Sequence, residues 1–430
     1  MFSRPLTQSD WDILQSYTRR IRSIQDVSGG LDKKSIKILS NPPTTELLFP
    51  NLRVLHCEYA KKTIPLLHLP LPSLVFLDVK FENSLRSFPK SSPDIRKIFI
   101  RICQLQDTFN KIESNYICCW QNLCSVICPQ VVLDVDGLAH LSWMPVLTQL
   151  TFSLRATLPA SNSPLFFSNL HDLSLHSKSL EPILRLLSQT RLPVITNLTA
   201  YINNCPSKQE LSSFLASVPT SNAHHTIERL QLTQWFSPLS NVLCSEAPLL
   251  DLEDLRPYMT LSNLRRIELD IEWNVDLTDS EVLMLASTWP KLEHLLINAD
   301  WGWNSLGGIT PDGLVQLLQT CRSLSGIALA FDTRGYTESH PSQAPASLGL
   351  TLPREFSIDV VDSIIEAESV SAVATFFSGI ATCSESDFSF YAWESDRMVA
   401  LLNTEEYMKR WDIVQQWVNH AVGRSSEFGD

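Results

Sequence analysis

Short apolar triplets recur along the chain in the order apolar-x-x-apolar-x-apolar, and turns rich in Pro, Ser, Asn and Lys precede them. Residues 49–57 read FPNLRVLHC, and residues 263–269 read NLRRIEL. Eleven copies occur in order, with first positions 21 to 37 residues apart. These first positions are Leu52, Leu74, Ile95, Leu123, Leu147, Leu170, Ile195, Ile227, Leu264, Leu292 and Leu324. One copy could arise by chance in a Leu-rich chain, but eleven in order predict an internal repeat.

This pattern is the L-x-x-L-x-L core of a leucine-rich repeat, in which each copy forms a short strand that pairs with the next. The later gaps between strands hold sequences typical of helices, because their apolar residues fall on one helical face. Such gaps are residues 181–190, 208–218, 278–288 and 310–321. The sequence therefore predicts an α/β fold: a right-handed leucine-rich-repeat solenoid with a curved parallel sheet on its concave face and helices and loops on its convex face.

The two ends differ from the middle, as the caps of a solenoid should. Residues 7–27 are expected to form a helix with Trp11, Leu14, Ile21 and Ile24 turned inward. Near the other end, residues 370–380 and 396–418 predict helices that flank a last strand at 387–394.

Residues 333–353 are rich in Ser and Pro and interrupt the array, which predicts a mobile surface insertion. The expected domain organisation is a helical lead-in at 1–40, a degenerate solenoid at 41–395 that includes this insertion, and a C-terminal helical cap and tail at 396–430.

The ordered segments LTQSDWDILQSYTRRIRSI, LFPNLRVLHC, LSNLRRIELDI and WPKLEHLLINADWGW resemble the mushroom-type fungal F-box proteins with degenerate leucine-rich repeats. The resemblance runs over essentially the whole chain. It implies a ubiquitin-ligase substrate receptor, in which an F-box of about forty residues binds a Skp-type adaptor and the repeats bind the protein to be modified. No LP-x-E-I/L start of an F-box occurs before residue 50, so the resemblance covers the repeat region without its F-box. A Skp-type adaptor is expected as a partner only if an F-box exists upstream.

The charge of the chain is unevenly distributed and bears on its partners. Residues 1–250 hold 23 basic and 18 acidic side chains, a net +5, whereas residues 251–430 hold 11 and 28, a net −17. Because no dense basic stripe occurs, nucleic acid is not an expected partner. The chain shows no secretory signal and no apolar run long enough to span a bilayer, so we expect a monomeric cytoplasmic or nuclear protein with reduced cysteines and no membrane partner.

Few side chains are arranged for chemistry. Cys118, Cys119, Cys124 and Cys128 cluster with Cys103 upstream, but Cys128 falls on an inward repeat position, which favours core cysteines over a zinc site. Asp134 and Asp136 have no neighbouring nucleophile or phosphate loop and indicate a turn. No P-loop, GxGxxG, GxSxG or HExxH motif occurs, so we expect no enzyme, no cofactor and no metal.

The outward positions of the strands remain as the candidate site, because side chains alternate between the two faces of a strand. They mix charges, amides and an imidazole, which suits protein recognition. The candidates are Arg229, Gln231, Arg266, Glu268, Asp270, His294 and Asn298.

Trp301 and Trp303 follow in a Gly-containing loop, either as anchors for a partner or packed over the neighbouring repeat. The hypothesis is a protein-binding scaffold. The alternatives are an enzyme with an unrecognised site in the 333–353 insertion or the cysteine cluster, and a degenerate paralogue with no retained partner.

Overall fold

The computed structural model describes most of the chain as two compact units. Unit 1 comprises Met1–Ser177 with Arg185–Ile195, and unit 2 comprises Lys178–Leu184 with Thr196–Asp430. The described residues are 6–25, 38, 46–57, 69–80, 92–101, 114–155, 164–218, 225–235, 248–305, 308–337, 350, 352–383, 387–391 and 404–423.

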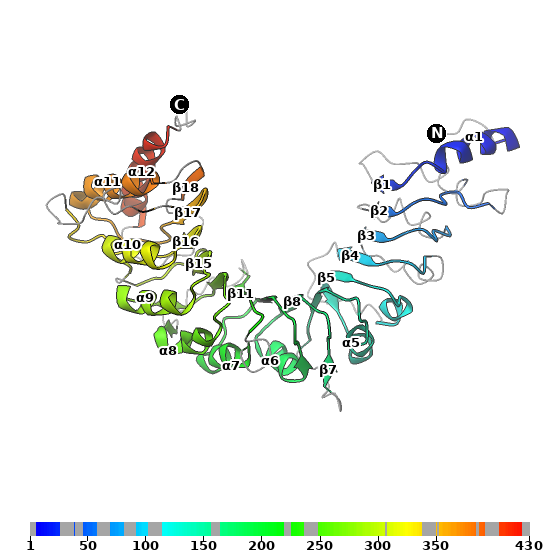
Figure 1. Ribbon diagram of the computed structural model, residues 1–430, viewed down its shortest axis with the longest axis horizontal. Helices are drawn as coiled ribbons and strands as arrows, with labels where there is room; N and C mark the ends of the chain where they lie inside the picture. Colours follow the sequence, from blue (N-terminus) through cyan, green and yellow to red (C-terminus); the bar gives the residue numbers. More distant parts are fainter. Residues whose placement is uncertain are drawn as a thin grey trace. The chain divides into compact units, whose positions relative to one another are not determined.

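Unit 1 contains seven parallel strands that pair in chain order (Figure 1). They are β1 (Ser23–Gln25), β2 (Val54–Cys57), β3 (Phe76–Lys80), β4 (Lys97–Arg101), β5 (Ser125–Val132), β6 (Gln149–Ser153) and β8 (Asp172–Ser177). A second, two-stranded pairing joins β7 (Leu165–Phe166) to β9 (Thr190–Arg191). Its helical elements are α1 (Gln8–Thr18), η3 (Ser114–Cys119) and α5 (Val135–Ser142), and α6 (Glu181–Ser188) begins in unit 2 and ends in unit 1.

Unit 2 also contains seven parallel strands in chain order. They are β10 (Asn197–Ile202), β11 (Arg229–Gln234), β13 (Arg266–Asp270), β15 (His294–Ile297), β16 (Gly326–Ala328), β17 (Glu355–Asp359) and β18 (Asp387–Tyr391). Its helical elements are α7 (Lys208–Val218), α8 (Leu252–Leu255), η5 (Arg256–Thr260), α9 (Asp279–Thr288), α10 (Pro311–Thr320), η7 (Ala367–Ser369), α11 (Val370–Ala381) and α12 (Thr404–Ala421). Figure 1 shows α7, α9 and α10 along one face of the sheet, and the short pair β12 (Leu249–Leu250) and β14 (Asn274–Val275) completes the unit.

All eleven predicted repeats form a strand of the parallel ladder, which confirms the leucine-rich-repeat solenoid. The apolar positions of the repeats are buried wherever their side chains are described; Leu264, Ile267 and Leu269 are at most 1% exposed. Two residues lie between the first and second apolar positions, and in most repeats both are at least partly exposed; Ser125 and Gly326 are the buried exceptions.

A second buried position lies three residues before the first leucine of a repeat. Trp120 and Trp289 occupy this position, one in each unit, and each is at most 2% exposed. The Trp120 indole Nε1–H donates to the Ser92 carbonyl oxygen at 2.9 Å, and the Trp289 Nε1–H donates to the Tyr258 carbonyl oxygen at 3.1 Å. Each ring thus fills the core and satisfies a buried carbonyl of the preceding repeat.

The predicted starts of α9 and α10 are confirmed, and one carboxylate links them. Thr310 caps α10, because its Oγ1 accepts from the Gly313 N–H at 3.0 Å. The Asp279 carboxylate at the start of α9 accepts from the Thr310 N–H at 2.8 Å and from its Oγ1–H at 2.6 Å. A Cβ on Gly313 would lie 2.0 Å from Asp279 Oδ1, so this close approach of two repeats requires glycine.

The predicted N-terminal helix is too long. Helix α1 ends at Thr18, and Ile24 lies in β1, which pairs with β2. Backbone pairing with the next repeat therefore outweighs the helical spacing of the apolar residues in this segment. Trp11 is buried, as expected.

The first residues of the predicted insertion pack against the fold. Thr333 is fully buried and its Oγ1–H donates to the Ile364 carbonyl oxygen at 2.8 Å, while Tyr336 packs edge-on against Phe376 of α11. The L-x-x-L-x-L pattern missed β17, whose apolar residues simply alternate. Residues 338–349 and 351 lie outside the described residues, as do 26–37, 39–45 and 392–403, so the predicted domain boundaries at 40 and 395 stay predictions.

Candidate functional site: the strand face of unit 2

The register of β10, β11, β13 and β15 places the residues that face outward from these strands in two rows. The first row is Asn197, Arg229, Arg266 and His294, and the second is Thr199, Gln231, Glu268 and Leu296. Every one of these side chains is at least partly exposed, whereas the residues between them along each strand are buried. We call these eight residues the strand face. The structure thus brings Arg229, Gln231, Arg266, Glu268 and His294 together on one surface.

Glu268 is the centre of a polar network on this face. Its Oε2 accepts from the Arg266 guanidinium at 2.7 Å, and its Oε1 accepts from the Gln231 amide at 2.7 Å. The Gln231 amide also lies 3.2 Å from Thr233 Oγ1. An exposed ion pair contributes at most about 1 kcal/mol to stability. Its larger effect is to hold three side chains in one arrangement, which lowers the entropy lost when a partner binds.

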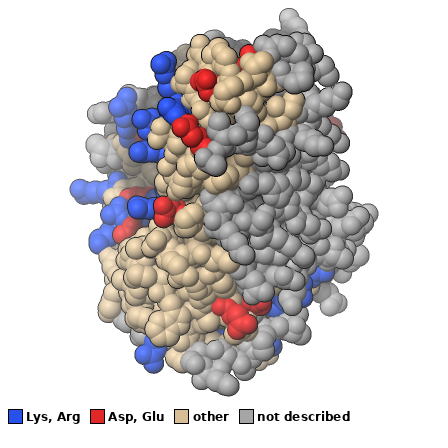
Figure 2. Space-filling view, turned by 90° about the vertical axis from the view of Figure 1, so that its right-hand side faces the viewer, with Lys and Arg blue, Asp and Glu red and all other residues tan. Residues whose placement is uncertain are grey.

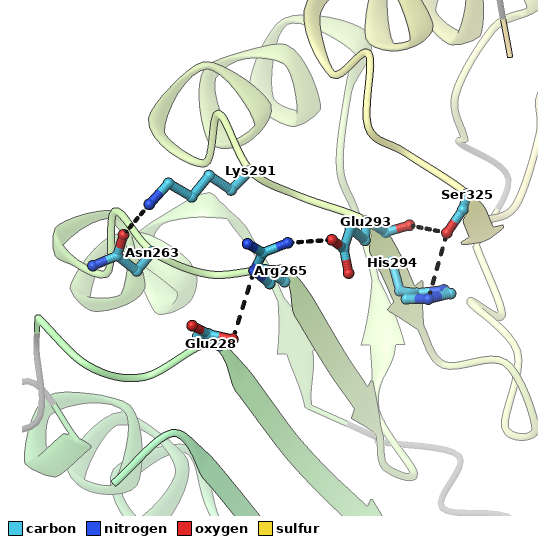
Figure 3. A network of polar contacts seen from close by, with 7 residues as sticks. All are labelled: Glu228, Asn263, Arg265, Lys291, Glu293, His294 and Ser325. Carbon is cyan, nitrogen blue, oxygen red and sulfur yellow. Dashed lines mark hydrogen bonds and ion pairs between the residues drawn. The ribbon is translucent and has the colours of Figure 1, made fainter. Parts of the chain in front are cut away.

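His294 lies over a glycine of the next strand. A Cβ on Gly326 would lie 2.5 Å from His294 Nδ1, so only glycine leaves room for the imidazole. The Nε2 atom lies 3.5 Å from Ser325 Oγ, as Figure 3 shows. Burial, together with the positive charge of Arg266, lowers the pKa of His294. The ring is therefore neutral at physiological pH and offers one donor and one acceptor.

A ladder of ion pairs borders the strand face where the strands begin. The residues directly before β11, β13, β15 and β16 are Glu228, Arg265, Glu293 and Ser325. Arg265 forms ion pairs with Glu228, 3.5 Å from its Nε, and with Glu293 (Figure 3). The Ser325 hydroxyl donates to the Glu293 carbonyl oxygen at 3.1 Å. Opposite charges alternate from Glu228 to Glu293, so these three side chains pair with one another.

The prediction that Asp270 is exposed on the strand face is wrong. Its side chain is 4% exposed, because the chain folds back over the end of β13. Its Oδ1 accepts from the Asp300 N–H at 3.1 Å and from the Trp301 N–H at 3.4 Å. Burial and the neighbouring Asp300 carboxylate raise the pKa of Asp270 to about 7. Asp270 therefore holds the loop that follows β15.

The same loop buries Asn298, Trp301 and Trp303, which the sequence offered as exposed candidates. Asn298 adopts φ 50° and is fully buried; its Oδ1 accepts from the Ile271 N–H at 3.1 Å, and its Nδ2 donates to the Trp273 carbonyl oxygen at 2.6 Å. Trp301 and Trp303 are 4% and 0% exposed. Of the two interpretations open for the tryptophans, the structure shows the packed one.

Trp303 fixes this loop in place through two hydrogen bonds. Its Nε1–H donates to the Ile297 carbonyl oxygen at 2.9 Å, and its backbone N–H donates to Asp362 Oδ1 at 2.8 Å. The Trp301 Nε1–H donates to the Gln234 carbonyl oxygen at 3.3 Å. The Trp301 ring and the Trp303 backbone therefore join neighbouring repeats, and the two buried rings offer almost no surface to a partner.

The sequence prediction missed Trp235, which directly follows β11. Its side chain is 49% exposed, and its ring packs edge-on against Tyr201 with 5.7 Å between ring centroids. Its backbone N–H donates to the Ile202 carbonyl oxygen at 2.7 Å, which fixes the position of the ring beside the strand face. In the sequence, Trp235 follows a strand just as Trp301 and Trp303 do. Only the fold of the next repeat decides which of them is covered.

The other candidate chemistry takes structural roles where it is described. Cys128 is fully buried, its Sγ lies 3.1 Å from the Thr151 carbonyl oxygen, and burial raises the pKa of its thiol to about 12. Cys119 is exposed, and Cys103 lies outside the described residues. Asp134 caps α5 by accepting from the Gly137 N–H at 2.9 Å.

No group of three or more His, Cys, Asp or Glu within the described residues could hold a metal ion. None of the helices described here is long and apolar enough to cross a membrane.

Comparison with known proteins finds only distant structural similarity. No protein-family model matches the chain, and no curated protein does. Among solved structures, the chain is similar to an internalin (inlF) from Listeria monocytogenes str. 4b F2365, with 13% identity, a TM-score of 0.39, and coverage of 87% of this chain and 88% of that one. It is also similar to TLR13 in a complex with ssRNA13, with 12% identity, a TM-score of 0.41, and coverage of 82% and 51%. Likeness this low carries no argument about binding, so the assignment of the chain as an α/β leucine-rich-repeat protein stands on its own ladder of strands.

Proposed function

We propose that the strand face of unit 2 binds a protein ligand, and that the chain is the substrate-recognition region of an F-box-type ubiquitin-ligase receptor. The first part has support from the geometry of the face. The second part has support from the sequence resemblance alone, and these 430 residues contain no F-box motif before residue 50.

The exposed Trp235 ring carries the proposal of protein binding. A half-exposed tryptophan supported by Tyr201 is the kind of side chain that dominates the energy of protein interfaces. The neighbouring Gln231–Glu268–Arg266 network is already ordered, and it presents amide and guanidinium groups to a partner. This combination of an aromatic anchor and fixed polar groups suits a protein surface better than a small molecule.

The test is capture of partners from cell extract by the wild-type chain and by Trp235→Ala, followed by quantitative mass spectrometry. Trp143→Ala is the matched control, because Trp143 follows α5 in unit 1 and is 85% exposed. Loss of an interface anchor costs about 2 kcal/mol, so Trp235→Ala should reduce capture of the true partner by 10-fold or more. Trp143→Ala should not. Equal capture by both variants would remove the strand face as the binding site.

The ligase role needs its own readout. The capture experiment is repeated with the native gene product expressed in its own cells. Recovery of a Skp-type adaptor and a cullin with the chain supports a ubiquitin-ligase receptor. Recovery of a Trp235-dependent partner without either subunit supports the binding scaffold and contradicts the ligase role.

A further inference from the structure

The residue directly before each strand also forms a column along one edge of unit 1. Before β1 to β4 these residues are Arg22, Arg53, Val75 and Arg96. The Arg53 N–H donates to the Arg22 carbonyl oxygen at 2.8 Å, the Val75 N–H to that of Arg53 at 2.9 Å, and the Arg96 N–H to that of Val75 at 2.9 Å. The four residues therefore lie on successive rungs, roughly 4.8 Å apart. We call this column the basic edge.

The arginines of the basic edge are exposed, and no acidic side chain in the described part of the chain pairs with them. Arg22, Arg53 and Arg96 are all exposed, and none has an ion pair or side-chain hydrogen bond among the described residues. Figure 2 views the end of the molecule near the N-terminus, where Lys and Arg side chains gather along the left margin. Unpaired guanidinium groups on neighbouring rungs attract a negatively charged ligand.

An open pocket of about 330 Å³ lies on this edge. Its lining consists of the arginines of two rungs, the turn residues beside them and an apolar floor. These residues are Asn51, Arg53, Pro72, Ser73, Val75, Asp94 and Arg96. Arg53 and Arg96 are two rungs apart, so their backbones are separated by about 10 Å with Val75 between them.

The polar groups of the pocket define the chemistry of its ligand. The Asn51 amide donates to the Arg19 carbonyl oxygen and the Ser73 hydroxyl to the Pro50 carbonyl oxygen, each at 2.7 Å. The charged donors left for a ligand are therefore the two guanidinium groups, while Asp94 supplies an acceptor. These groups suit a ligand with two negative groups, an apolar part against Pro72 and Val75, and an N–H for Asp94.

We infer that this pocket binds an acidic protein segment in the polyproline II conformation, with carboxylates three residues apart. A polyproline II helix has three residues per turn and rises 3.1 Å per residue, so side chains i and i+3 lie on one face about 9 Å apart. That spacing is close to the roughly 10 Å between the backbones of Arg53 and Arg96. A nucleic acid fits less well, because no dense basic stripe extends the site beyond these arginines. This site lies in unit 1 and does not depend on the function proposed for the strand face.

Fluorescence anisotropy with a labelled peptide EPPEPPEPP and the full chain tests the inference. The wild-type chain should bind the peptide saturably, and QPPQPPQPP should not bind. Arg53→Glu with Arg96→Glu should weaken binding at least 10-fold, because each guanidinium loses a charge-assisted pair and gains a repulsion. The control is Arg191→Glu with Arg322→Glu, two exposed arginines outside the basic edge, which changes the net charge equally. It should change the affinity less than 2-fold.

Three outcomes overturn the inference. They are no saturable binding of EPPEPPEPP by the wild-type chain, an equal loss of affinity in the control variant, and tighter binding of a ten-residue oligothymidylate that competes with the peptide. Thermal unfolding of both double variants confirms that each chain is folded in the assay.

Discussion

The charged residues directly before the strands make different contacts in the two units. In unit 2, Glu228, Arg265 and Glu293 alternate in sign and pair with one another (Figure 3). In unit 1, the corresponding column is the basic edge, whose arginines have no acidic neighbour on the adjacent rungs. The same repeat position therefore holds charges that pair with one another in unit 2 and arginines that are available to a ligand in unit 1. The repeat sets where a side chain stands, and its neighbours on the adjacent rungs decide whether it is available to a partner.

The buried positions show no such difference, and they should give the largest effects. Trp120→Ala in unit 1 and Trp289→Ala in unit 2 each remove a buried indole, which typically costs about 3–5 kcal/mol. Thermal unfolding should therefore show a large and comparable loss for both variants. Trp→Phe at either position keeps most of the volume and removes the N–H that satisfies a buried carbonyl, so it should cost less, about 1–3 kcal/mol. A variant tolerated in one unit but not in the other would show that the two cores are built differently.

The next effect belongs to unit 2 alone and depends on pH. The folded-state pKa of Asp270 is raised to about 7, well above that of an unfolded aspartate, because the carboxyl is buried beside Asp300. Protonation therefore favours the folded state. Its stabilising effect is complete below about pH 4 and is lost as the pH rises through about 7, by on the order of 2–4 kcal/mol.

Calorimetry between pH 4 and pH 8 measures this loss. Asp270→Asn retains an oxygen that can accept from the Asp300 and Trp301 N–H groups and cannot ionise, so it should flatten the pH dependence. An unchanged pH dependence in Asp270→Asn would assign the titration to another group.

Charge reversal on the two edges gives the smallest effect and tests the comparison itself. Arg265→Glu removes two ion pairs and places three acidic residues on adjacent rungs, and it should destabilise the chain by about 1 kcal/mol. Arg53→Glu breaks no pair and should change stability by less than about 0.5 kcal/mol. Raising the NaCl concentration from 0.1 to 0.5 M should reduce the difference, because both sites are exposed. Equal effects in thermal unfolding would mean that the ladder of unit 2 does not stabilise it.

The sequence predicted the strands well, because the requirement for an apolar core repeats at every copy. Leu264, Ile267 and Leu269 are buried, and the core of the repeat would be exposed to solvent without them. Each strand therefore keeps the apolar pattern. Strands β1 and β17 were missed, since their apolar residues do not follow L-x-x-L-x-L. Ile24 is predicted to be helical because the local spacing of apolar residues fits a helix. Its pairing with β2 is a contact with a distant segment, which local spacing does not record.

The candidate site was predicted only in part. Arg266, Glu268 and His294 follow from strand alternation, which is local. Trp301 and Trp303 resemble Trp235 in the sequence, as aromatic residues just past a strand. Their burial depends on Asp270 and Asn298 folding the loop back over the preceding repeat, which is a tertiary arrangement.

Hydroxyl-radical footprinting of the complex with the captured partner tests most directly whether the exposed strand positions carry binding. Oxidation of Trp235 should fall several-fold when the partner binds, while oxidation of the exposed Trp143 stays constant and that of the buried Trp301 and Trp303 stays low in both states. Unchanged oxidation of Trp235 in a complex that protects other surfaces would contradict binding through the strand face.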